Sequence, residues 1–399
     1  MRIGRWLAVF VAVMIQFAGT PSASAAWDPE WHRAPAMSIQ AVAADRAGHV
    51  YVTGFAPRGP ERYFGRPLAM VLAKFDAAGN RLWTRTWRGT ARFWPFALGM
   101  SLAVAPDGGL VYAGGALISD AGENARARLW AYSAAGRLRW IARWPHTHDA
   151  GIVSAVATRP SGVVAGGFSV GAWDRDGSRR WVRPFSQPFR NGFGVVRDIG
   201  IEQGHVLAAG FVGRLDPEVT EVLYPGPLDP RMYEDTDAAI RVYTASGTLV
   251  WSLVREDPTV RDHDAALSLD VSADRILVAG QIGTSQSRYR GWLARLSSGG
   301  RIVSAERYGD PDGLTRVAGV SRAPWDHVYL VLDRRSGRAD ARRTLVLREQ
   351  GLWGAHLSKR SITLRPHATA SGVATTWGRK LYVTAQLFAE GGDLWRLPP

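Results

Sequence analysis

The chain has 399 residues, of which 46% are hydrophobic and 21% are charged, proportions typical of a globular protein with one large core or two ordinary ones. It contains no cysteine, which excludes disulfide bonds, cysteine-ligated zinc, iron–sulfur clusters and thiol catalysis. The net charge of +14 comes from 49 basic and 35 acidic residues, but the longest basic runs are pairs. Nucleic-acid-binding surfaces usually carry clustered basic residues, so we expect no nucleic-acid partner.

The amino terminus has the parts of a secretory signal peptide. Arg2 and Arg5 are basic, residues 6–17 form an apolar run, and Ala23-Ser24-Ala25 matches a cleavage site. We expect a signal peptide over residues 1–25, cleavage near Ala25 or Ala26, and export to the periplasm or beyond. No later stretch approaches 18 uncharged apolar residues, so we expect no transmembrane segment.

The remaining chain, residues 26–399, is built from repeats. Residues 38–87 contain four short β-type runs separated by turn signals. The second run recurs as LVYAGG, GVVAGG, HVLAAG and RILVAG, and more weakly as VYLVL and LYVTA. Its anchor residues are Gly54, Gly114, Gly166, Gly210, Gly280, Leu332 and Ala385. Spacings of this order indicate an array of small sheet units.

The fourth run has a signature of its own, a turn glycine four residues before a tryptophan. It occurs at Gly79/Trp83, Gly136/Trp140, Gly177/Trp181 and Gly247/Trp251. A wide aromatic residue at one fixed strand position suits packing between neighbouring sheets. The seventh unit has no room for a fourth strand, and Trp31 lies ahead of the first unit. We therefore predict an all-β, seven-bladed β-propeller of four-stranded blades, closed by an N-terminal strand that completes the last blade.

The first unit resembles a known family. VAADRAGHVYVTG followed by MVLAKFDAAGNRLWTRTW is similar to the bacterial SBBP-type β-propeller repeat, and the similarity is recognisable through about residue 300. The resemblance implies a propeller fold and export; members of this family are mostly uncharacterised exported or surface proteins.

Three histidines share one repeat position. His148, His263 and His367 precede the second-strand anchors of units three, five and seven by 18, 17 and 18 residues. By resemblance to other propellers, this segment leads to the innermost strand, so three imidazoles would meet at one mouth of the central channel. Such a set could hold a divalent transition metal, with Asp149 and Asp264 as further ligands, hydrogen-bond acceptors or bases. Alternatively, duplicated units have kept an ancestral loop residue.

The other expectations concern loops and partners. His49, His205 and His327 each begin a second strand, and we interpret them as turn or strand-entry residues. Unit four carries an acidic insertion, residues 213–237, which is either a lid or a tolerated insertion on the face of the three histidines.

We expect a monomeric, non-enzymatic binding or scaffolding protein that uses its loop face and channel mouth. Its ligand would be a protein or a cell-envelope polymer, since a basic surface attracts polyanions. The charge could also reflect a basic surface without a specific partner. The alternative function is a metal-dependent lyase or hydrolase, with Asp149 or Asp264 as base.

Overall fold

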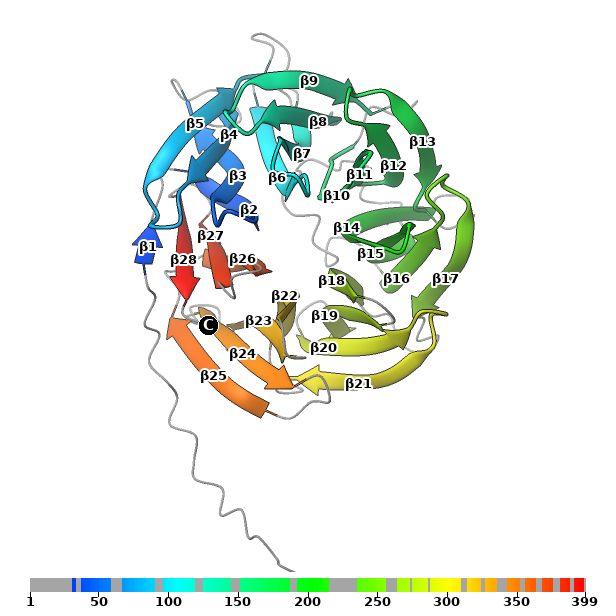
Figure 1. The fold of residues 1–399 in the computed structure, drawn as a ribbon. Helices are drawn as coiled ribbons and strands as arrows, with labels where there is room; N and C mark the ends of the chain where they lie inside the picture. Colours follow the sequence, from blue (N-terminus) through cyan, green and yellow to red (C-terminus); the bar gives the residue numbers. More distant parts are fainter. Residues whose placement is uncertain are drawn as a thin grey trace, which may run out of the picture.

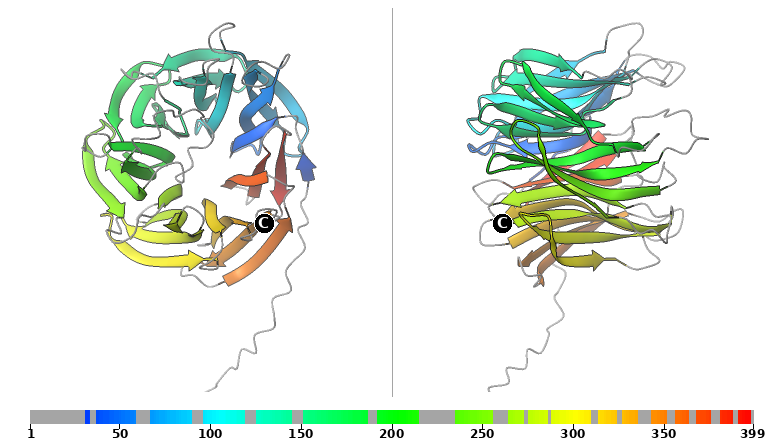
Figure 2. Two further views of the ribbon diagram at one scale, coloured as in Figure 1. Left: turned by 180° about the vertical axis from the view of Figure 1, so that it is seen from behind. Right: turned by 90° about the vertical axis from the view of Figure 1, so that its right-hand side faces the viewer.

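In the computed structural model, all described secondary structure is β-strand, and the sheets follow one another in chain order around a common axis (Figure 1). The edge-on view shows the sheets fanned around this axis (Figure 2). The structure describes residues 31–33, 37–58, 67–89, 96–118, 125–144, 151–186, 192–214, 235–255, 264–272, 275–285, 288–309, 314–323, 327–335, 343–351, 356–363, 368–375, 381–387 and 391–397.

Four consecutive sheets contain four antiparallel strands each, paired in chain order. The first has β2 (Ser38–Ala44), β3 (Val50–Pro57), β4 (Leu68–Phe75) and β5 (Arg81–Trp87). The second has β6 (Phe96–Val104), β7 (Leu110–Ile118), β8 (Ala125–Ser133) and β9 (Leu138–Arg143). The third has β10 (Ala155–Arg159), β11 (Gly162–Gly166), β12 (Ser169–Asp174) and β13 (Arg179–Pro184). The fourth has β14 (Gly192–Glu202), β15 (His205–Arg214), β16 (Asp235–Tyr243) and β17 (Leu249–Arg255).

The next sheet has eight strands. Its first half has β18 (Ala265–Ser272), β19 (Arg275–Ser285), β20 (Arg288–Ser297) and β21 (Ile302–Tyr308). Its second half has β22 (Leu314–Ala323), β23 (His327–Arg335), β24 (Arg343–Gly351) and β25 (His356–Thr363). The halves are joined by one parallel residue pair between β20 and β22, Tyr289 with Leu314. Within each half the pairing is antiparallel and follows the order of the four-stranded sheets.

The last sheet joins the two ends of the fold. β26 (Ala368–Thr375), β27 (Leu381–Leu387) and β28 (Gly391–Leu397) pair in order, and β1 (Trp31–Arg33) adds to β28 as the fourth strand. The register places Trp31 opposite Arg396 and Arg33 opposite Leu394. The segment before the first repeat thus supplies an outer strand to the last sheet, and β2 in turn contacts β26, β27 and β28.

Burial differs between the strands of one sheet. β3 and β4 are buried on both faces along most of their length, because their apolar side chains pack against the sheets on either side. In β5, by contrast, only the two tryptophans are partly buried. The second and third strands therefore form the core, while the fourth strands, β5, β9, β13, β17, β21 and β25, form the outer perimeter (Figure 1).

Most of the innermost strands share an irregularity. The register between the first and second strands shifts by one residue at Gln40, Met100, Arg197, Leu267, Ala318 and Ser371. Such a bulge bends a strand and increases its local twist. Sequence periodicity did not predict it, because a strand such as β6 is buried on both faces over most of its length and shows no alternation for the extra residue to interrupt.

Candidate functional site

Most of the predicted site lies outside the described residues. This holds for His148, Asp149, His263 and His367, and for residues 215–234 of the acidic insertion. Among the residues that the structure describes, no group of three or more His, Asp or Glu side chains is arranged to hold a metal ion. The metal site therefore stays a prediction, and Asp264 is the one predicted site residue whose contacts the structure describes.

Asp264 is a buried residue that links neighbouring sheets. Its Oδ1 accepts a hydrogen bond of 3.0 Å from the Gly283 backbone N–H, and its Oδ2 lies 3.5 Å from Nη1 of Arg255. Its backbone also exchanges two hydrogen bonds with Thr236, at 2.8 Å from the Asp264 N–H and 3.1 Å from the Thr236 hydroxyl. Because its carboxylate is engaged on both oxygens, Asp264 holds the start of β18 against β16, β17 and β19.

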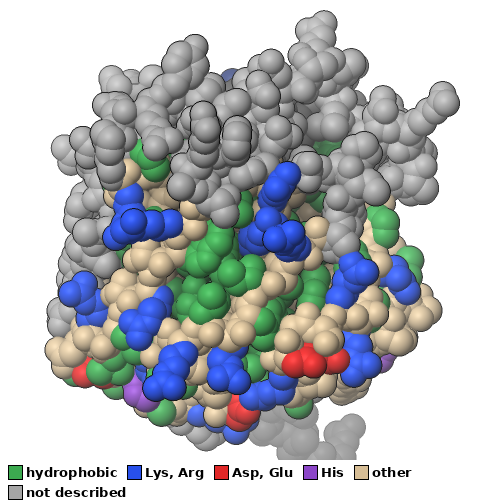
Figure 3. All heavy atoms as spheres, turned by 90° about the horizontal axis from the view of Figure 1, so that it is seen from above, with side chains coloured by type: hydrophobic (Ala, Val, Ile, Leu, Met, Phe, Trp, Pro, Cys, Tyr) green, Lys and Arg blue, Asp and Glu red, His purple; other side chains and the backbone are tan. Residues whose placement is uncertain are grey.

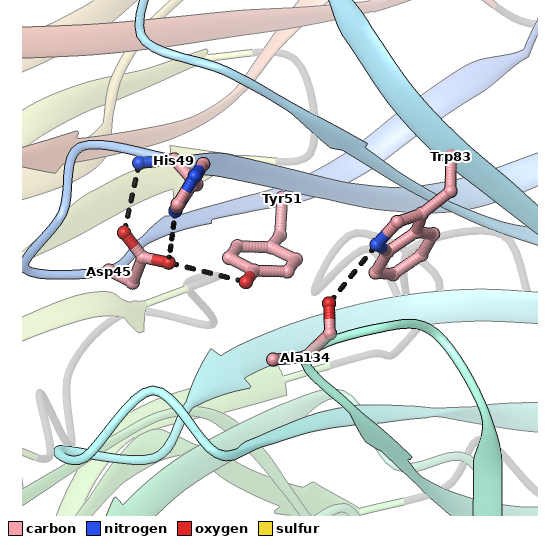
Figure 4. A network of polar contacts seen from close by, with 5 residues as sticks. All are labelled: Asp45, His49, Tyr51, Trp83 and Ala134. Atoms are coloured by element: carbon pink, nitrogen blue, oxygen red, sulfur yellow. Dashed lines mark hydrogen bonds and ion pairs between the residues drawn. The ribbon is translucent and has the colours of Figure 1, made fainter.

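The three histidines lie at turns or strand entries, as predicted: His49 lies in the turn before β3, and His205 and His327 are the first residues of β15 and β23. In Figure 4, Asp45 accepts a hydrogen bond from the His49 backbone N–H at 2.9 Å and pairs with the His49 ring Nδ1 at 2.8 Å. The Tyr51 hydroxyl donates to the same carboxylate at 3.3 Å. Burial and the adjacent Asp45 raise the pKa of Tyr51 above its usual range. The ring Nδ1 of His327 likewise lies 2.8 Å from a carboxylate, that of Glu349, but Glu349 is on the paired strand β24.

The fourth-strand tryptophans lock each sheet to the next. The indole N–H of Trp83 donates to the carbonyl of Ala134, in the turn of the following sheet, at 3.1 Å (Figure 4). Trp140, Trp181 and Trp251 repeat this bond to Arg175, Ala245 and Ser298. The ring lies on the turn glycine: a Cβ at Gly247 would lie 2.5 Å from Cδ2 of Trp181. These tryptophans are structural, as the sequence indicated.

Arginine strengthens two of these locks. Arg85, two residues after Trp83, donates from Nε to the carbonyl of Gly136 at 2.7 Å. Arg183, two residues after Trp181, donates to Gly247 at 3.0 Å. A tryptophan followed two residues later by arginine is thus a signal for this contact, which the sequence analysis missed.

The boundary after β21 departs from this pattern. Ser304 stands where β5, β9, β13 and β17 carry tryptophan, and Arg295 lies opposite it in β20. Nη1 of Arg295 donates to Ser304 at 3.1 Å and to Glu306 at 2.7 Å, and Tyr308 donates to Glu306 at 2.8 Å. Across this boundary the Tyr308 hydroxyl lies 3.2 Å from Oε1 of Gln350 in β24, so a contact between polar side chains takes the place of the indole bond.

A carboxylate network connects three innermost strands. Asp198 of β14 accepts hydrogen bonds from the Leu269 N–H at 2.7 Å and from the Ser268 hydroxyl at 3.2 Å, both on β18. Ser268 in turn accepts from Val320 of β22 at 3.1 Å. Burial raises the pKa of Asp198 to about 6, although these backbone and hydroxyl donors oppose the shift.

The outer perimeter combines exposed apolar and basic side chains. Leu82, Leu138, Leu249 and Ile302 lie near the start of four fourth strands, β5, β9, β17 and β21, and are 45–52% exposed. The basic residues of the six fourth strands are Arg81, Arg85, Arg139, Arg143, Arg179, Arg180, Arg183, Arg255, Arg307, Lys359 and Arg360, whereas their one acidic residue is Glu306. Figure 3 shows basic side chains interspersed with apolar ones on one side of this perimeter.

Comparison with known proteins places the chain among β-propellers. It matches the structure of U3-55K with a TM-score of 0.57 and 13% identity, covering 93% of this chain and 100% of that one. It also matches a polysaccharide lyase, the PL25 ulvan lyase, with a TM-score of 0.56 and 8% identity over 92% and 96% of the chains. YCF48 bound to D1 peptide matches with a TM-score of 0.53 and 9% identity over 96% and 100%. At these identities the likeness shows the fold alone.

Comparisons of the sequence with known proteins assign the chain to no family. No protein-family model matches the chain, and no curated relative matches it. The propeller fold implied by the SBBP resemblance thus agrees with the solved structures, while membership of that family is not shown. The described residues include no helix that is long and apolar enough to cross a membrane.

Proposed function

We propose that this chain is an exported, non-enzymatic β-propeller that binds or scaffolds a partner. The observation that carries the proposal is that contacts of buried carboxylates and fourth-strand indoles tie neighbouring sheets to one another. Asp264, Asp198, Asp45 and the fourth-strand tryptophans all have partners across sheets or turns. A ring tied together in this way presents rigid surfaces on which a partner can bind.

The proposal includes the finer architecture. We count the eight-stranded sheet as two blades, because one residue pair joins its halves, and so arrive at seven blades. Pairing of β1 with β28 would close the ring and leave no unpaired edge between the last blade and the first. We further propose that residues 1–25 direct export and that the mature chain is a monomeric relative of SBBP-repeat proteins.

Two structural neighbours lend support by analogy, because they are solved with partners. One is YCF48 bound to D1 peptide, and the other is Drosophila Plexin A in complex with Semaphorin 1b, with a TM-score of 0.51 and 9% identity over 94% and 88% of the chains. The ulvan lyase neighbour shows that the same fold also carries enzymes. The discriminating experiment must therefore test for chemistry directly.

Metal content and turnover separate a binding protein from the metal-dependent alternative. The purified chain is dialysed against zinc, nickel or copper, freed of loosely bound ions, and analysed by elemental mass spectrometry. We expect substoichiometric metal and no change in the chain length of acidic polysaccharides incubated with the protein. Stoichiometric metal together with cleavage, both lost in His148→Ala, would establish the lyase or hydrolase instead.

A further inference from the structure

We propose that the outer perimeter binds an acidic polysaccharide through an outer belt, defined as the exposed side chains of β5, β9, β13, β17, β21 and β25. This inference rests on the proposed function and names the partner's chemistry.

The first argument is the sign of the charge. Basic residues of the belt such as Arg81, Arg139 and Arg179 are exposed and form no ion pair with any described carboxylate. The single acid of these strands, Glu306, is engaged by Arg295. The chain as a whole has 49 basic and 35 acidic residues, so the belt is far more one-sided than the chain. A field of one sign attracts a polyanion and repels a polycation.

The second argument is repetition. The basic side chains come from equivalent strands of successive sheets, and these strands form the outer perimeter of the ring (Figure 1). A polymer with an anionic group on each residue can engage several of them at once. Each additional contact then forms at high effective concentration. Guanidinium groups also bind carboxylates through two parallel hydrogen bonds, which favours a carboxylate-bearing chain.

The third argument concerns the apolar part of the belt. Leu82 and Leu138 are sequence neighbours of Arg81 and Arg139, Leu249 begins β17, and all three leucines are half exposed. A chain of sugar rings offers both C–H surface and carboxylates, so it matches a surface on which aliphatic and basic side chains alternate. The indoles are a poor platform for stacking bases, because their rings pack on the next turn glycine and their N–H groups are bonded.

The curvature of the belt excludes two other polyanions. The belt follows the convex perimeter of the ring, so a flat bilayer would touch only one sector of it (Figure 1). Double-stranded DNA is stiff over about 50 nm and cannot follow so tight a curve. Single-stranded nucleic acid is flexible enough, but its binding depends on exposed aromatic platforms.

The test uses polygalacturonate as the probe and its methyl-esterified, uncharged form as the matched control. Binding to the full mature chain is measured by isothermal titration at several NaCl concentrations. We expect binding of polygalacturonate only, with an affinity that falls as salt rises, because bound cations are released. The triple variant Arg81→Gln/Arg139→Gln/Arg179→Gln should weaken binding about tenfold and reduce the salt dependence.

A second triple variant controls for total charge. Arg46→Gln/Arg126→Gln/Arg288→Gln removes three exposed arginines that lie off the belt, and should change affinity less than about threefold. Leu82→Ser/Leu138→Ser/Leu249→Ser should weaken binding while leaving the salt dependence unchanged. Melting temperatures close to that of the wild type would show that the variants are folded.

Several results would overturn the proposal. One is an equal loss of polygalacturonate affinity in the belt and off-belt arginine variants, and another is wild-type affinity in the Arg81→Gln/Arg139→Gln/Arg179→Gln variant. Binding of the esterified polymer, or tighter binding of oligo-dT or phosphatidylglycerol vesicles than of polygalacturonate, would also overturn it. The proposed function fails differently: if polygalacturonate is shortened by the protein, the chain is an enzyme, whether or not the belt binds. If the polymer keeps its length and the belt arginine variant binds it as tightly as the wild type, the outer-belt proposal is refuted and the proposed binding function is not.

Discussion

The contact between a tryptophan and the turn glycine of the next sheet can be tested by adding a single methyl group. Gly247 has a φ of +84°, and a Cβ there would lie 2.5 Å from Cδ2 of Trp181. Gly108 has a similar φ of +70°, but a Cβ there would meet no atom within 4 Å. Gly247→Ala and Gly108→Ala therefore impose the same backbone cost and differ in the contact alone.

The expected costs follow from these geometries. A left-handed alanine costs roughly 1–2 kcal/mol, which is the whole effect expected for Gly108→Ala. Gly247→Ala must also displace a fused ring atom that cannot swing aside, which strains the packing by roughly 1–3 kcal/mol. It further breaks the bond from Trp181 to Ala245, worth about 1 kcal/mol. We expect Gly247→Ala to be the more destabilising by at least roughly 2 kcal/mol.

The assay is urea unfolding followed by far-UV circular dichroism and by tryptophan fluorescence, whose coincidence tests for a single transition. A double-mutant cycle with Trp181→Ala supplies the control, because the penalty at Gly247 should shrink to that at Gly108 once the ring is removed. Equal midpoints for the two glycine variants, or an undiminished penalty in the Trp181→Ala background, would refute the account of the contact.

Three further predictions concern other parts of the chain. Deleting residues 26–34 removes β1, exposes the edge of β28 and should lower stability by roughly 2–3 kcal/mol; an unchanged melting temperature would count against the role of this strand. Since the pKa of Asp198 is raised to about 6 in the folded state, its contribution to stability is fully present below pH ~4 and is lost as pH rises through about 6. In Asp198→Asn the free energy of unfolding should fall less between pH ~4 and ~6 than in the wild type. Identical pH profiles of the two proteins would contradict this prediction. A reporter fused to residues 1–30 should cross the inner membrane and be cleaved near Ala25 or Ala26; retention in the cytoplasm would overturn the predicted export.

Sequence reasoning predicted those features of the fold that repeat. The four runs of each unit, the turn glycines and the role of Trp83 and its equivalents were all readable, because each obeys a local period or spacing. The strand at Trp31 was inferred from the absence of a fourth strand in the last unit, and it pairs with β28.

Features that depend on contacts between distant residues were not readable. Asp198 and Leu269 are 71 positions apart, and nothing local to Asp198 indicates that a backbone N–H will reach it. Asp264 was singled out because it follows His263, whereas its described partners are Arg255 and Gly283. The outer belt was not apparent from the sequence, because its basic residues occur singly or in pairs and gather only when equivalent strands are brought to one perimeter.

The pairing of β1 with β28 makes the chain a candidate for circular permutation. Because Trp31 lies opposite Arg396, the two ends of the described fold are neighbours in space although they are farthest apart in sequence. A short linker can join such ends, and new ends can then be opened in an exposed turn elsewhere, such as the one at Gly108. The order of the sheets around the axis would be preserved in this circular permutant. We therefore expect the fold to depend on the pairing of β1 with β28 and not on which turn carries the chain ends.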